Sequence, residues 1–126
     1  MEAERATPLA SIVGGANLPS RLLGRVNATW PLAVLTRHDQ RVTIKLRPPG
    51  ALFGPEPFDV TPHDVEAVFP TRGYLGGRGI GFRLADGTEV YFWTGKGKAL
   101  LDALEGDGFP VSRDLQRAAK VWGGEA

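Results

Sequence analysis

Two short glycine-rich stretches carry residue types that bind phosphate in many proteins. "GGRGIG" spans residues 76–81, and "TGKGK" spans residues 94–98. Backbone N–H groups in such turns, together with lysine side chains, can hold an anion. Neither stretch is a nucleotide-binding motif, because a glycine follows Lys96 and no G-x-G-x-x-G occurs. "TGKGK" still predicts a helix start at which Lys96 and Lys98 could bind an anion. The alternative is a solvent-exposed helix entry.

The histidines and serines give little support for catalysis. His38 stands beside Asp39 and His63 beside Asp64, but neighbours on a strand point to opposite faces. Neither histidine has a metal-ligand spacing, and no serine lies in G-x-S-x-G. The chain has no cysteine, which excludes a thiol nucleophile and a cysteine-ligated metal. The sequence therefore predicts no enzyme, no cofactor and no metal. An enzyme with an unrecognised site is the alternative.

Composition limits the classes of partner. The chain has 126 residues, which favours one domain, and its 15 basic and 14 acidic residues give a net charge of +1. This balance predicts no nucleic-acid partner. No apolar stretch approaches the ~18 residues of a transmembrane helix, and the N-terminus does not resemble a secretory signal. We therefore expect a cytoplasmic protein, with peripheral attachment to a membrane as an alternative.

The elements that would position any site are mostly β-strands. In "QRVTIKLR" (residues 40–47) Val42, Ile44 and Leu46 alternate with polar residues, which is typical of a strand with one buried face. "FDV" predicts a further short strand. The following "TPHD" predicts a helical turn capped by Thr61.

The N-terminal segment has a weaker pattern. Residues 1–26 contain several glycines and prolines, and we expect them to form an extension that packs on the core. Within this segment, "PSRLLGRV" (residues 19–26) predicts a short helix, with an interfacial membrane anchor as the alternative.

Two helices are predicted near the C-terminus. The first runs from about residue 96 to 105 and ends at Gly106 or Gly108. The second lies in a helical tail of residues 112–126, with Ser112 as its cap. The apolar stripe of the first helix is Leu100, Leu101 and Leu104.

Residues 79–93 predict a β-hairpin whose register follows from its turn. A three-residue loop, Ala85 to Gly87 with Gly87 in the left-handed conformation, sorts the side chains cleanly onto two faces. One face pairs Phe82 with Val90 and Ile80 with Phe92. The other pairs Arg83 with Glu89, Gly81 with Tyr91 and Gly79 with Trp93.

This hairpin predicts an aromatic surface. Gly79 and Gly81 would leave room for the rings of Tyr91 and Trp93. Two rings on an outward face need a cover, which the chain's own terminus, a partner or a second copy could supply. Tyr91, Trp93, Gly79 and Gly81 are therefore the candidate partner-binding residues.

A second candidate surface is basic. It centres on the first hairpin, which we expect "WPLAVLTR" (residues 30–37) and "QRVTIKLR" (residues 40–47) to form. Its alternative is an ordinary polar sheet face. The candidate anion-binding residues are Arg37, Arg41, Lys45, Arg47, Arg78, Lys96 and Lys98.

The succession of short strands and a late helix resembles the small bacterial pleckstrin-homology-like (PH-like) domains. The resemblance covers residues 27–111 and rests on "NATWPLAVL", "FGPEPFDVTPHDVEAVFP", "IGFRLADGTEVYFWT" and "ALLDALEGDGFPV". It implies a mainly β fold, a partly open barrel or sandwich of about six to seven antiparallel strands capped by one C-terminal helix.

The resemblance also implies a function. Bacterial domains of this shape are regarded as interaction modules, so we expect a non-catalytic module for protein–protein contact or self-association in the bacterial cytoplasm. Lipid-binding members carry basic residues in the first hairpin, and Arg37, Lys45 and Arg47 occupy similar positions. Binding of anionic lipid or a phosphorylated ligand is therefore the alternative.

Overall fold

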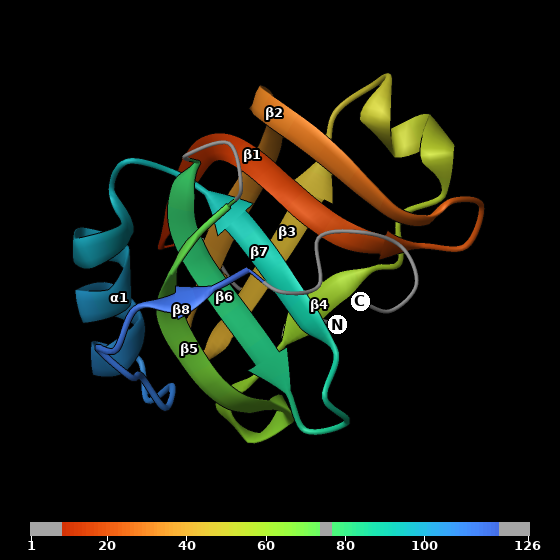
Figure 1. The fold of residues 1–126 in the computed structure, drawn as a ribbon. Coiled ribbons are helices and arrows are strands. Elements are labelled where there is room, and N and C mark those ends of the chain that lie inside the picture. Colours follow the sequence, from red (N-terminus) through yellow and green to blue (C-terminus); the bar gives the residue numbers. More distant parts are fainter. Residues whose placement is uncertain (1–8, 74–76, 119–126) are drawn as a thin grey trace, which may run out of the picture.

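A computed structural model describes residues 9–73 and 77–118 of the chain. Within these ranges the chain forms one sheet of eight strands, in the order β4-β3-β2-β1-β7-β6-β5-β8. The sheet curls into a half-barrel with the helix α1 beside it (Figure 1). The predicted fold class, mainly β with a C-terminal helix, is confirmed. The elements are β1 (Ala10–Ser20), β2 (Gly24–His38), β3 (Arg41–Leu46), β4 (Phe58–Val60), β5 (Val65–Arg72), β6 (Arg78–Leu84), β7 (Glu89–Trp93), α1 (Gly97–Gly106) and β8 (Gln116–Arg117), with short 3-10 helices η2 (Gly50–Phe53) and η3 (Pro62–Asp64).

The first described strand lies inside the sheet and not on its surface. β1 pairs with β2 on one side, and residues 15–17 pair with residues 91–93 of β7 on the other. Gly14 permits this close approach, since a Cβ there would lie 2.5 Å from the carbonyl oxygen of Trp93. The described part of the expected N-terminal extension is therefore a central strand. The helix predicted for residues 19–26 is wrong, because these residues form the end of β1, the turn at residues 21–23 and the start of β2.

The β6–β7 hairpin has the predicted register. Leu84 and Thr88 close a loop of three residues, and Gly87 has a φ of +91°. The observed partners are Gly79 with Trp93, Ile80 with Phe92, Gly81 with Tyr91, Phe82 with Val90 and Arg83 with Glu89.

The helical turn predicted between two strands is η3. The Thr61 backbone N–H and hydroxyl both donate to Oδ2 of Asp64, at 2.9 and 3.1 Å. These hydrogen bonds hold the pKa of the Asp64 carboxyl below its ordinary value. The turn directs the chain from β4 into β5.

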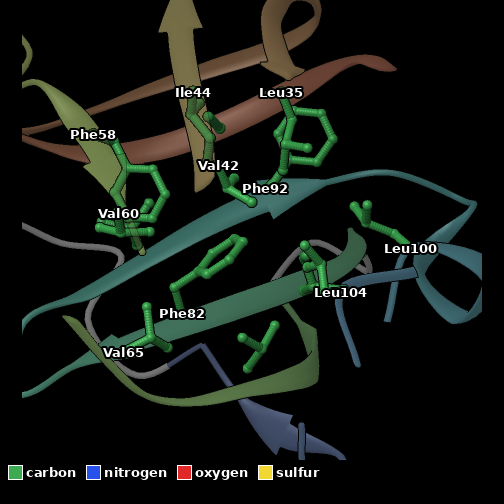
Figure 2. Packing of buried hydrophobic residues seen from close by; sticks show 14 of the residues in the cluster. Leu35, Val42, Ile44, Phe58, Val60, Val65, Phe82, Phe92, Leu100 and Leu104 are labelled. Carbon is green, nitrogen blue, oxygen red and sulfur yellow. The ribbon is translucent and has the colours of Figure 1, made fainter. Parts of the chain in front are cut away.

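α1 closes the interior of the half-barrel. The three leucines predicted as its apolar stripe, Leu100, Leu101 and Leu104, are at most 3% exposed. Leu100 and Leu104 belong to the same buried cluster as Phe82 and Phe92 of the hairpin (Figure 2). After α1, Gly108 has a φ of +97°, and the N–H of Phe109 returns to the carbonyl of Leu104. Among the described residues, no helix has the length and apolar character needed to cross a bilayer.

The C-terminal segment runs along β5 and is not helical over its described part. Val68 pairs with Val111, and β8 lies parallel to β5 through Thr71 and Gln116. Hydrogen bonding to this open edge overrides the helical spacing of residues 112–118. The remainder of the predicted helical tail, residues 119–126, lies outside the described residues. β8 also makes the sheet mixed, whereas only antiparallel strands were expected.

Candidate functional site

The predicted aromatic surface is largely filled from within the chain. Tyr91 is fully buried and clusters with Phe69 of β5 and with Ala118, just beyond β8. Trp93 is partly buried and stacks on Tyr91, with ring centroids 5.7 Å apart. Tyr91 is therefore covered in the monomer, and only Trp93 retains exposed surface among the two rings.

The two strand glycines make room for neighbours other than those expected. A Cβ at Gly81 would lie 2.4 Å from the ring of Phe69, and a Cβ at Gly79 would lie 1.9 Å from the carbonyl oxygen of Phe92. The expectation that they accommodate the rings of Tyr91 and Trp93 is wrong. Both glycines are buried, so they contribute to packing of the sheet and present no surface.

A buried carboxylate lies beside the aromatic cluster. Oε1 of Glu89 accepts a hydrogen bond of 2.5 Å from the Tyr91 hydroxyl, and Oε2 lies 2.9 Å from Nε of Arg83. Nη2 of Arg83 also donates to Oε1 of Gln116 in β8. Glu89 therefore joins β7 to β6 through Arg83, and Arg83 in turn joins β6 to β8 through Gln116.

A second hydrogen-bond network contacts Tyr91 through Arg25. Nε of Arg25 donates to Oδ1 of Asn17 at 2.7 Å, and its guanidinium lies 5.7 Å from the Tyr91 ring centroid. Asn17 and Trp93 both donate to Oδ1 of Asn27. Burial lowers the pKa of the Arg25 guanidinium from its ordinary value, while Tyr91 and Glu89 act in the opposite direction. This network carries structural roles that the sequence did not indicate.

Three of the seven candidate anion-binding residues are held in ion pairs. Arg37 makes a two-pronged contact with Asp107, with distances of 2.9 and 3.1 Å. Arg41 lies 2.9 Å from Asp59. Lys98 pairs, at 3.5 Å, with Asp102 one helical turn along α1. These carboxylates reduce the positive potential of the expected basic surface.

The remaining four belong to three separate parts of the chain. Arg47 donates to the carbonyl of Pro31 at 3.3 Å, and Lys45 is exposed on β3. Arg78 is exposed at the start of β6. Lys96 lines a hollow of about 430 Å³ with Trp30 and the loop before α1. No ion pair is found for Lys45, Arg78 or Lys96 within the described part of the chain.

The histidines are not assembled with other catalytic or metal-binding groups. Among residues 9–73 and 77–118, no three side chains of the metal-ligating types lie together. His38 ends β2, and His63 lies in η3.

One exposed apolar surface was not recognised as such from the sequence. Leu22 and Leu23, in the β1–β2 turn, are 67% and 57% exposed, and Leu52 and Phe53 of η2 are 74% and 43% exposed. Ser20 joins the two segments. Its hydroxyl oxygen accepts hydrogen bonds from the N–H groups of Leu22 and Leu23 and donates to the carbonyl of Phe53. We call these four apolar residues, with Arg21, the apolar tip. The turn and η2 lie on the same side of the half-barrel, away from α1 (Figure 1).

A small cavity opens next to the apolar tip. Its volume is about 230 Å³, and its floor consists of core residues at the end of the half-barrel, including Leu18, Phe58 and Val90. Glu56 and Thr88 are the polar residues of its lining. The backbone of Glu56 is fixed to β1 by a hydrogen bond to the carbonyl of Pro19. The cavity and the apolar tip therefore flank the same backbone contact between β1 and the segment before β4.

Comparison with known proteins adds no family to this description: no protein-family model matches the chain, and no curated protein matches its sequence.

Proposed function

We propose that the chain is a non-catalytic interaction module of PH-like fold, which acts by protein–protein contact or self-association in the bacterial cytoplasm. The apolar tip carries this proposal. Four apolar side chains gathered on one rigid projection cost solvation free energy unless another molecule covers them, and exposed clusters of this kind mark interaction sites in many proteins.

The topology supports the PH-like part of the proposal. β1 to β4 form one antiparallel meander and β5 to β7 form a second, the two are joined through β1 and β7, and α1 comes directly after β7. This is the succession of strands and helix on which the resemblance rests.

The lipid-binding alternative has less support. It depends on free cations in the first hairpin, but Arg37 and Arg41 are held by Asp107 and Asp59. An ion-paired guanidinium attracts an anionic surface less strongly than a free one.

In-cell photo-crosslinking tests the proposed function. A photoreactive phenylalanine analogue replaces Leu23, and a matched control replaces Leu115, which is similarly exposed at 59% but lies near β8. We expect covalent protein adducts from position 23 and few from position 115. Equal or absent adducts at both positions would contradict an interaction role for the apolar tip.

A further inference from the structure

We infer that the partner of the apolar tip is a second copy of this chain, in a two-fold dimer in which the tip of each protomer enters the cavity of the other. This inference rests on the proposed function and specifies its partner. It follows from the size of the cavity, from the charges at the two surfaces and from their proximity on one protomer.

The size of the cavity favours side chains over a cofactor. Pockets that hold a drug-sized ligand measure about 300–1,000 Å³. The cavity, at about 230 Å³, lies below that range, and its floor is the apolar core. One or two aliphatic side chains fit this volume and chemistry. Leu22 and Leu23 are such side chains, presented together at a turn.

The charges at the two surfaces are complementary. Arg21 is exposed directly before the two leucines, and Glu56 belongs to the lining of the cavity. Neither side chain forms an ion pair within residues 9–73 and 77–118. A partner's Arg21 can therefore meet Glu56 as its Leu22 and Leu23 enter the cavity. No acidic residue lies between residues 5 and 38 or between residues 40 and 55, so the tip itself has no competing carboxylate in its own sequence.

The position of the two surfaces permits two-fold symmetry. A two-fold interface needs a self-complementary patch, in which residue i contacts residue j and residue j contacts residue i. Arg21 and Glu56 flank one backbone contact: Ser20 pairs with Pro55, Arg21 N–H bonds the Gly54 carbonyl, and Glu56 N–H bonds Pro19. Because the tip and the cavity are adjacent on one protomer, one two-fold rotation can place the tip of each protomer at the cavity of the other.

Sedimentation velocity on the purified full chain is the first measurement. We expect reversible dimers, with a dissociation constant of micromolar order because the interface is small. The double change Leu22→Asp and Leu23→Asp should weaken dimerisation at least about tenfold, since it places charge in an apolar cavity. The matched control is Leu115→Asp, which should leave it unchanged. A chain that stays monomeric up to about 1 mM, a concentration at which even weak specific contacts form, would overturn the inference.

Charge reversal gives the decisive comparison. In Arg21→Glu, both contacts of the dimer become Glu–Glu, and in Glu56→Arg both become Arg–Arg. Each variant alone should dimerise at least about tenfold more weakly than the original chain. Mixing the two variants restores two Arg–Glu contacts in the mixed dimer, so association should return on mixing. Lys98→Glu, a similar charge reversal on α1 and far from the tip, should have no effect.

The remaining outcomes are each decisive. Failure of the mixed variants to associate would contradict the tip-in-cavity arrangement. A dimer dissociation constant that no substitution at the tip alters would contradict it as well. Binding of the monomer to vesicles of phosphatidylserine and phosphatidylcholine, abolished by the two leucine changes, would identify a membrane as the occupant instead. Crosslinks from position 23 to a different protein, with a monomeric chain in solution, would overturn this inference and leave the proposed function standing. Crosslinks to the chain itself, with restored association on mixing, would support both.

Discussion

Phe69 of β5 lies over Gly81 of β6 so closely that only a hydrogen atom fits beneath its ring: a Cβ at position 81 would lie 2.4 Å from Cε1 of Phe69. Both residues are buried, and Phe69 also supports the ring cluster that contains Tyr91. The glycine is therefore required by the packing of the outer face.

Gly81→Ala should destabilise the protein by about 1–3 kcal/mol, because the buried ring cannot move away without loss of packing. Urea unfolding measures the effect as a shift of the midpoint. Gly81→Ala should cost less in a Phe69→Leu background than in the original chain, because the ring is gone. Equal costs in the two backgrounds would show that the clash lies elsewhere.

Gly87→Ala should destabilise by about 1 kcal/mol through backbone strain alone. Gly87 has a φ of +91°, and nothing lies within 4 Å of an added Cβ. Gly95 is the matched control, since its Cβ would also meet open space but its φ lies outside the left-handed region. Gly95→Ala should be neutral or stabilising in the same unfolding experiment. A neutral Gly87→Ala would contradict the assigned loop.

Glu89→Gln should destabilise by about 1–3 kcal/mol, since it leaves Arg83 without its charged partner in a largely buried site. Glu66→Gln provides the control, because Glu66 is exposed on β5. Urea unfolding at neutral pH compares the two variants. If both behave alike, the Glu89 carboxylate does not join β7 to β6.

Asp64→Asn should lower the melting temperature at pH 7 and have less effect in acid. The pKa of Asp64 is lowered in the folded state from an ordinary value of 3.8, chiefly by the hydrogen bond from the Thr61 N–H. The stabilisation by Asp64 is therefore present above pH 3.8 and is lost as the pH falls through the lower folded-state pKa. Melting curves of the original chain and of Asp64→Asn, from pH 7 into acid, test whether the difference in melting temperature shrinks as the pH falls. A difference that grows in acid would be opposite to this expectation.

Local signals were enough to predict the cap at Thr61, the β6–β7 hairpin and α1. The Asp86–Gly87 turn fixed which residues of β6 and β7 face each other, because slipping the register by one residue would bury charge. Thr61 and Asp64 are close in sequence, so their cap could be recognised directly. The three leucines of α1 similarly needed only a helical period.

The first strand and the tail could not be recognised in this way. β1 contains Gly14, Gly15 and Pro19, which normally interrupt strands, and it pairs with β7, which lies far along the sequence. β8 follows the edge of β5, a preference that no local pattern carries. In both cases, long-range pairing between strands outweighed the local secondary-structure propensity of the residues.

The surroundings of the candidate site residues could not be predicted for a related reason. Arg37 meets Asp107, 70 positions away in sequence, so its charge seemed free until the fold was known. Leu22 and Leu23 have the spacing of a helix face, and only the turn geometry shows them to be exposed. Tyr91 was correctly placed on the outer face, but the residues around it, Phe69, Arg25 and Ala118, come from distant parts of the sequence.

The pairing of β1 with β7 also sets the order in which the protein can form on the ribosome. Residues 15–17 are synthesised long before residues 91–93, their partners. Until then β1 has β2 on one side and an open edge on the other, and open strand edges capture other chains. Closure is a late, long-range event, and such events slow folding. The edge of β1 is thus unpaired while residues 18–90 are being synthesised, and unpaired strand edges favour aggregation.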